Sequence, residues 1–174
     1  ITGFDFFGGD LRGIIEKLPY LKDLGISGIY LLPVFLSDTN HKYNTFDYTK
    51  IDPDFGTEED LIELVKTAHA MGIRVMLDAV FNHSGTEFAP WQDVWEKGED
   101  SAYFDWFCIH KTPFERKFAS LRDGRFDGFA CLDNMPKLNA GNPEVQAYFA
   151  DITSYWVRNW GIDGIRFDVG NEVS

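Results

Sequence analysis

The sequence contains few cysteines, and the two that it has lie far apart. Cys108 and Cys131 are its only thiols in 174 residues. Neither belongs to a C-x-x-C pair, so the spacing argues against a disulfide scaffold and against a cysteine-rich zinc module. Two unpaired thiols are typical of a reducing compartment, and we therefore expect a cytoplasmic protein.

Positive charge is also scarce. Lysine and arginine total 16 against 28 aspartate and glutamate residues, which gives a formal net charge of -12. Such a surface repels polyanions, so we expect no nucleic acid and no anionic membrane as partner. No apolar run approaches the roughly 20 residues of a membrane span.

An initiator methionine is missing as well. The chain begins I-T-G-F-D, which indicates that it was cut from a longer protein. For that reason the lack of a recognisable signal peptide carries no information about targeting.

Apolar and aromatic residues are abundant, and they follow a repeated pattern. Hydrophobic residues make up 44% of the chain, which includes 16 Phe and 7 Tyr. Three segments each consist of an amphipathic helix, a glycine and an apolar strand. The predicted strands are Gly28–Val34, Ile73–Val80 and Ile162–Val169. Their nearly continuous apolar character predicts parallel strands buried on both faces, in an α/β sheet.

Local signals mark the ends of the predicted helices. Residues that favour the N-cap position precede them, followed in one case by a capping-box acid and in another by proline at the first helical position. These N-cap residues are Asp10, Thr57 and Asn142. Glycines suited to a left-handed conformation follow the helices. These are Gly25, Gly72 and Gly161.

A long insertion separates the second and third strands. Residues 84–140 contain Trp91, Trp95 and the aromatic cluster Tyr103–Phe107. A subdomain after the carboxyl end of a strand is where α/β enzymes build their binding clefts. We therefore divide the chain into residues 1–83, the insertion 84–140, and residues 141–174.

Polar side chains gather at the carboxyl ends of two predicted strands. Asp78, Asn82 and His83 follow the second strand, and Arg166 and Asp168 end the third. Arg166 and Asp168 are two residues apart, so an extended strand places both on the same face. A neighbouring cation favours the ionised carboxylate, which is the form that a covalent nucleophile needs. Convergence of five such residues on one sheet edge favours a functional site.

These motifs resemble those of a known enzyme family. D-A-V-F-N-H at 78–83 and G-I-D-G-I-R-F-D at 161–168 look like two signature regions of the α-amylase family of glycoside hydrolases. M-P-K-L-N at 135–139 and N-E at 171–172 resemble its neopullulanase and cyclomaltodextrinase branch. The segment 41–57, with H-K-Y-N-T-F-D-Y and D-P-D-F-G-T, is similar to the family's loop after its second strand.

The resemblance implies a role for each matching residue. Asp168 would be the nucleophile that forms a glycosyl–enzyme intermediate, and Arg166 would hold it ionised. Asp78 would orient that arginine. The substrate-binding residues would be His41 and His83, which bond sugar hydroxyls, Tyr43, which stacks on the ring, and Glu172, on the acceptor side. Asn82 matches a position that binds calcium in many relatives, although this branch often lacks the ion.

The resemblance also implies a fold, a reaction and a gap. The fold would be a partial (β/α)8 TIM barrel, about strands 2–4 with their helices, with the inserted subdomain after the third strand. The reaction would be retaining hydrolysis of α-glucosidic linkages in α-glucans such as maltooligosaccharides, cyclodextrins and pullulan, without a required cofactor. Such catalysis needs a second carboxyl group, and the family places its acid/base glutamate, and a later aspartate, on strands beyond this segment. We therefore expect the isolated chain to be inactive, and to self-associate through exposed barrel edges.

Two other interpretations stay open. A metal-dependent barrel hydrolase could use Asp78, His83 and Asp168 as ligands, but the H-x-H spacing common at such sites is absent. Alternatively, the chain could be a non-catalytic module that binds glucan or only packs within a larger enzyme.

Overall fold

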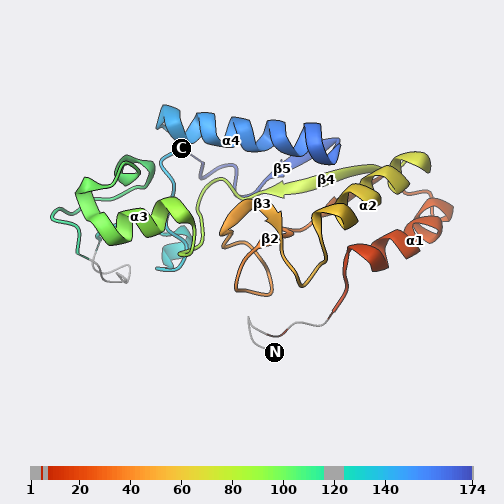
Figure 1. Ribbon diagram of the computed structural model, residues 1–174, viewed down its shortest axis with the longest axis horizontal. Coiled ribbons are helices and arrows are strands. Elements are labelled where there is room, and N and C mark those ends of the chain that lie inside the picture. Colours follow the sequence, from red (N-terminus) through yellow and green to blue (C-terminus); the bar gives the residue numbers. More distant parts are fainter. Residues whose placement is uncertain (1–4, 6–7, 116–123, 174) are drawn as a thin grey trace.

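The structure is a computed structural model that describes residues 5, 8–115 and 124–173. Its main sheet has three strands in the order β1-β4-β5, all parallel: β1 (Gly28–Leu31), β4 (Arg74–Ala79) and β5 (Gly164–Phe167). A second, antiparallel pair consists of β2 (Phe35–Leu36) and β3 (Asp47–Ile51). The molecule is elongated, with the helices along the sheet and the insertion at one end (Figure 1).

The helices begin and end where local signals predict. They are α1 (Leu11–Asp23), α2 (Glu58–Ala70) and α4 (Pro143–Tyr155). Asp10 caps α1 by accepting a hydrogen bond from the Gly13 amide, and Thr57 forms a reciprocal capping box with Asp60. Gly25, Gly72 and Gly161 all have positive φ, as a helix end that turns back toward a strand requires.

The three strands are shorter than predicted. β1 ends at Leu31 rather than at Val34, because Pro33 has no amide hydrogen with which to continue a ladder. β4 and β5 also lose residues at both ends relative to Ile73–Val80 and Ile162–Val169. The order of strands and helices is nonetheless the predicted one.

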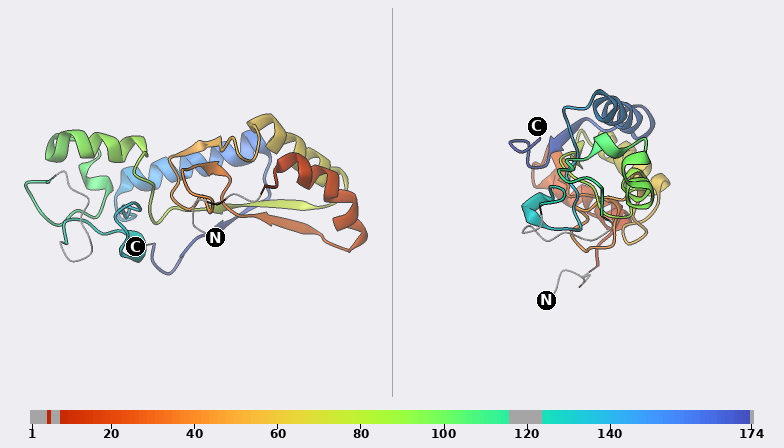
Figure 2. Two further views of the ribbon diagram at one scale, coloured as in Figure 1. Left: turned by 90° about the horizontal axis from the view of Figure 1, so that it is seen from below. Right: turned by 90° about the vertical axis from the view of Figure 1, so that its left-hand side faces the viewer.

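The expected burial of both sheet faces is wrong. Leu31, Val75 and Leu77 are buried on the face covered by α1, α2 and α4, which lie on one side of the strands (Figure 2). On the other face Tyr30 is 41% exposed and Met76 36% exposed. Among the described residues no element covers this second face, and the three strands form an open sheet rather than a closed barrel.

The inserted segment has its own aromatic core. It contains α3 (Ala89–Lys97), three short 3-10 turns, η1 (Gly98–Asp100), η2 (Phe104–Trp106) and η3 (Phe129–Cys131), and isolated β-bridges. The Trp91 ring packs edge-on against Phe107 and Phe126, with centroids 4.8 Å and 4.9 Å away. Residues 116–123 of the predicted insertion lie outside the described residues, and the three domain boundaries stay a prediction.

A π-helical turn, η4 (Trp156–Trp160), connects α4 toward β5. The Trp156 and Trp160 rings stack on each other, and Phe35 of β2 stacks on Trp156 with centroids 4.7 Å apart. The Trp156 indole donates to the Tyr48 carbonyl oxygen, and the Trp160 indole donates to Glu58. The β2–β3 pair is thereby packed against the helical layer.

No helix in the described part of the chain is long and apolar enough to cross a membrane.

Candidate active site at the carboxyl ends of the strands

The parallel register brings the predicted charged residues together. Asp78 near the end of β4 pairs directly with Arg166 of β5. One residue beyond β5, the Asp168 amide donates to the Ala79 carbonyl oxygen at 3.1 Å, which fixes Asp168 beside the same strand end. Both carboxylates are buried, and Asp168 is 7% exposed.

Arg166 links the two carboxylates. Its Nη1 lies 2.9 Å from Asp78 Oδ2 and 2.8 Å from Asp168 Oδ1. Burial lowers the pKa of Arg166, but attraction to Asp78 and the hydrogen bond to Asp168 outweigh it, so the net pKa is raised. The guanidinium therefore remains charged between the two acids.

Two tyrosines also bind Asp78. Tyr30 and Tyr43 both donate their hydroxyls to Asp78 Oδ2, the latter at 3.1 Å. Burial raises the pKa of Asp78, although these hydrogen bonds and the charge of Arg166 oppose the rise. Asp78 is thus a fully engaged carboxylate that fixes the positions of its neighbours.

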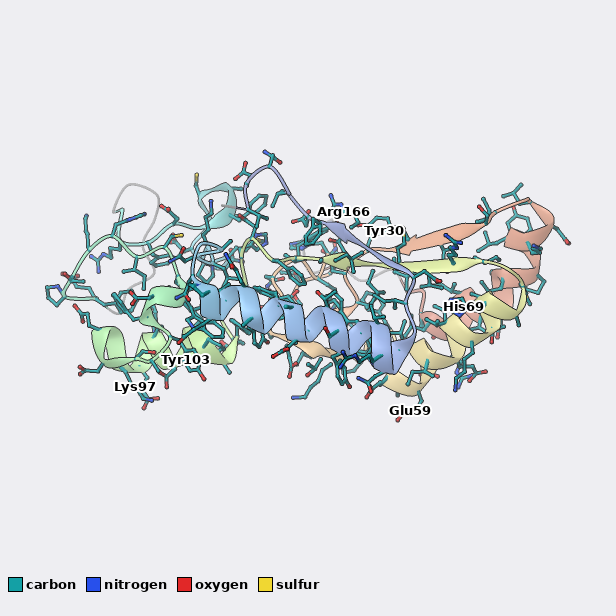
Figure 3. The ribbon with its side chains drawn as sticks, turned by 90° about the horizontal axis from the view of Figure 1, so that it is seen from above. Tyr30, Glu59, His69, Lys97, Tyr103 and Arg166 are labelled. Atoms are coloured by element: carbon teal, nitrogen blue, oxygen red, sulfur yellow. The ribbon has the colours of Figure 1, made fainter. Side chains whose placement is uncertain are left out.

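Tyr30 is a site residue that our sequence analysis missed. It lies on β1, and its ring centroid is 6.0 Å from Arg166 Cζ, as the neighbouring labels in Figure 3 show. Burial, followed by the hydrogen bond to Asp78, raises the pKa of the Tyr30 phenol. The available signal was a single polar hydroxyl, that of Tyr30, within the otherwise apolar strand Gly28–Leu31.

The loop between β2 and β3 supplies His41 and Tyr43. The His41 ring is exposed, and its Nδ1 accepts a hydrogen bond from the Tyr43 amide at 3.1 Å. Burial lowers the pKa of His41 and raises that of Tyr43. Because the Tyr43 hydroxyl is bonded to Asp78, the face of its ring is the part left to contact a ligand.

His83 is completely buried and bonded at both nitrogens. Its side chain is 0% exposed. Nε2 lies 3.1 Å from the Tyr43 carbonyl oxygen, to which it donates, and Nδ1 lies 3.3 Å from the side-chain Nδ2 of Asn82, from which it accepts. The Phe129 ring of the insertion stacks on the imidazole, with centroids 4.6 Å apart. Burial lowers the pKa of His83 to about 4, although the charge of Asp168 opposes the shift.

Within the described part of the chain, Asn82 and Glu172 make no hydrogen bond or ion pair with Asp78, Arg166 or Asp168. Asn82 is buried, and its Oδ1 has no hydrogen-bond partner. Glu172 is exposed in a turn after β5, where its amide donates to the Val169 carbonyl oxygen at 2.7 Å.

The side chains near Asn82 do not make a calcium site by themselves. Ca²⁺ takes six to eight oxygen ligands, several of them carboxylates, and Asn82 offers one unsatisfied amide oxygen. Within the described ranges no three His, Cys, Asp or Glu side chains are grouped to hold a metal. The metal-hydrolase set of Asp78, His83 and Asp168 also fails on geometry, because both His83 nitrogens are bonded within the chain.

Comparison with known proteins gives a consistent result. The chain is 54% identical over 169 residues to an intracellular maltogenic amylase of Bacillus subtilis, covering 97% of this chain and 28% of that protein. It is 54% identical over 172 residues to a cyclomaltodextrinase of Geobacillus thermopakistaniensis, covering 99% and 29%. The solved structure of a cyclomaltodextrinase superposes with a TM-score of 0.90 at 49% identity, over 99% of this chain and 29% of that one.

These matches confirm the family resemblance and its branch, and with them the barrel class of the fold. The chain spans less than a third of the length of these relatives. The family model described as "Alpha amylase, catalytic domain" matches residues 2–174. The chain therefore belongs to the α-amylase family of glycoside hydrolases.

Proposed function

We propose that the protein containing this chain hydrolyses α-glucosidic linkages in α-glucans by a retaining double displacement, with Asp168 as nucleophile. The observation that carries the proposal is the Arg166 bridge between Asp168 and Asp78 at the carboxyl edge of a parallel sheet. In a (β/α) barrel this edge is where catalytic residues lie. The names of the relatives, maltogenic amylase and cyclomaltodextrinase, support maltooligosaccharides and cyclodextrins as substrates, and we include pullulan.

The contacts suggest how Asp168 would act. Arg166 occupies its Oδ1, so Oδ2 is the oxygen that would attack the anomeric carbon of the sugar. The glycosyl–enzyme ester would then be hydrolysed by water, with net retention of configuration. Asp78 would hold Arg166 in place through both of its oxygens.

Three other side chains would contact the sugar, and a fourth, His83, would support one of them. Tyr43 would stack on the ring, His41 would bond a hydroxyl, and Glu172 would face the acceptor side. His83 would act by holding the Tyr43 carbonyl oxygen, and it could bond a sugar hydroxyl directly only by releasing that contact. Hydrolysis of this kind requires no organic cofactor. Calcium at Asn82 would need several oxygen ligands besides the unpaired Oδ1 of that residue.

We further propose that the acid/base comes from outside these 174 residues. A retaining glycosidase needs two carboxyl groups about 5–5.5 Å apart. Asp78 is committed to Arg166 and two phenols, which leaves it unsuited to deliver a proton. The isolated chain would therefore be inactive.

The open sheet face suggests how the isolated chain would behave. Tyr30 and Met76 are exposed there, and uncovered apolar area of this kind favours association. We propose that the isolated chain self-associates. By analogy with the intracellular relative from Bacillus subtilis, we also propose a cytoplasmic location.

The test is Asp168→Asn in the full-length protein. Turnover of maltotriose and of β-cyclodextrin should fall by about 10⁴-fold or more, because the attacking oxygen is lost while the shape is kept. Calorimetry should still detect sugar binding. Asp163→Asn is the matched control, because Asp163 immediately precedes the first residue of β5, at the end of the strand away from Asp168, and bonds the Val75 amide and His69. The turnover of this variant should equal that of wild type. Wild-type activity in Asp168→Asn would overturn the assignment. Wild-type protein that binds α-glucans without cleaving them would instead indicate a non-catalytic binding module.

A further inference from the structure

Lys42 combines two unusual properties at a sensitive position. It lies between His41 and Tyr43 in the loop that joins β2 to β3. Its side chain is only 4% exposed, and its backbone adopts a left-handed φ of 60°. Lysine is rarely buried, and a side chain with a β-carbon rarely adopts this φ. Neither property follows from the local sequence, so something else must hold the residue in place.

Two carboxylates hold the ammonium group. Lys42 Nζ lies 2.9 Å from Asp52 Oδ2 and 2.8 Å from Asp54 Oδ2, and it also donates to the Ser37 carbonyl oxygen at 3.3 Å. Nζ also lies over the Phe55 ring, 5.7 Å from its centroid. Burial lowers the pKa of Lys42, but the two hydrogen-bonded acids outweigh it and raise the pKa overall.

Asp52 ties this ion pair to the backbone of the loop. Its Oδ2 accepts from the Ser37 amide, and its Oδ1 accepts from the Asp54 amide, both at 3.0 Å. The ammonium therefore connects the start of the loop to the residues that follow β3. A buried, fully paired charge of this kind is costly to disrupt, since removal of one partner leaves the other uncompensated.

The two neighbours of Lys42 are bonded to each other and to the charged cluster. With Lys42 turned into the protein, the Tyr43 amide reaches His41 Nδ1 at 3.1 Å, a contact across one intervening residue. Tyr43 then places its hydroxyl on Asp78 and its carbonyl oxygen on His83. The inward ammonium and the outward sugar-binding pair are two sides of the same turn.

We propose that Lys42 is a positioning residue whose buried ion pair with Asp52 and Asp54 sets the loop that presents His41 and Tyr43 to substrate. The inference rests on the proposed function, because it concerns how that site is assembled. Lys42 does not contact the sugar in this arrangement. It acts through the two residues beside it.

The principal variant is Lys42→Met in the full-length protein, which keeps the stem and removes the charge. Measured well below the temperature at which the variant unfolds, its kcat/KM on maltotriose should fall roughly 10- to 100-fold. Lys50→Met is the matched control, since Lys50 is an exposed lysine of β3 that pairs with Asp47 at 3.0 Å. That variant should keep its wild-type kcat/KM. Wild-type kinetics in Lys42→Met would overturn the proposal.

A double variant separates positioning from general stability. Lys42→Met/Asp52→Asn also removes the charge that Lys42→Met leaves buried, so it should recover much of the lost Tm. Its kcat/KM should stay low, because the ion pair that sets the loop is still absent. Recovery of kcat/KM together with Tm would show that Lys42 serves stability alone.

Hydrogen exchange gives a readout that does not depend on activity. The Tyr43 amide, which is bonded to His41, should exchange faster in Lys42→Met than in wild type. In Lys50→Met its exchange rate should equal that of wild type. Slow exchange of this amide in Lys42→Met would overturn the positioning role even if the full-length protein cleaved no glucan. An inactive wild-type protein with accelerated exchange in Lys42→Met would overturn the proposed function and leave the loop mechanism supported.

Discussion

The ring Nε2 of His83 lies 3.1 Å from the carbonyl oxygen of Tyr43. The two residues are far apart in sequence, and the bond joins the end of β4 to the loop between β2 and β3. Because the imidazole is buried and donates to a carbonyl oxygen while its other nitrogen accepts, it is held in one neutral tautomer. This bond and the contacts of Arg166 with Asp78 and Asp168 lead to the following expectations for stability, the pKa of His83 and turnover.

Acid should destabilise the full-length protein through His83. Its pKa is about 4 in the folded state and about 6.5 when unfolded. Since the unfolded state takes up the proton first, stability falls as pH drops below about 6.5, and the loss is complete below about 4. Between pH 7.5 and 4.5, urea unfolding should show a wild-type loss about 2–3 kcal/mol larger than that of His83→Gln. An equal pH dependence in His83→Gln and wild type would contradict the assignment.

Phe129→Ala should raise the pKa of His83. The Phe129 ring stacks on the imidazole, so its removal lets water reach the ring and relieves the burial that lowers the pKa. An NMR titration of the His83 Cε1 proton should show the midpoint moving from about 4 toward 6.5. Leu132→Ala, an exposed change in the same loop, should leave the midpoint unchanged. A midpoint still near 4 in Phe129→Ala would mean that other groups bury the ring.

Arg166→Met should destabilise the protein by about 3 kcal/mol, because it leaves Asp78 and Asp168 buried without a cation. Adding Asp78→Asn should restore much of this stability but no turnover, since Asp168 would still lack its arginine. Chemical denaturation and hydrolysis assays of both variants test this. Arg158→Met, at an exposed arginine of η4, should change neither quantity. Turnover in the double variant would show that the bridge is dispensable.

Tyr30→Phe should cost about 1–2 kcal/mol of stability, because a buried carboxylate loses one of its donors while the ring packing stays. The pKa of Asp78 should rise further for the same reason, and turnover should fall through the weakened hold on Arg166. Tyr20→Phe, at an exposed tyrosine, should stay within about 0.5 kcal/mol of wild type. Urea unfolding measures both, and equal stabilities would argue that the Tyr30–Asp78 bond contributes little.

Local signals in the sequence were enough to predict the helix ends and the charged core of the site. Capping residues act within one turn of chain, and the carboxyl ends of parallel strands must meet at one edge, so Asp78, Arg166 and Asp168 could be grouped in advance. Tyr30, Lys42 and Phe129 could not. Tyr30 reaches Asp78 across 48 residues, Lys42 depends on a left-handed turn, and Phe129 depends on how the insertion returns to β4. An apolar strand also does not reveal which of its faces is covered, and for that reason the expected two-sided burial was wrong.

The stack of Phe35 on Trp156 has a consequence for how the site keeps its shape. Phe35 leads into the loop that carries His41 and Tyr43, and η4 leads into the strand that carries Arg166. The wider π-helical turn sets Trp156 and Trp160 parallel, so that Phe35 stacks against both rings. The loop that carries Tyr43 and the strand that carries Arg166 are therefore held by the same three stacked aromatic rings. A substitution that changes the size of the Phe35 or Trp156 ring would therefore alter the distance between Tyr43 and Asp168, although neither of those residues is replaced.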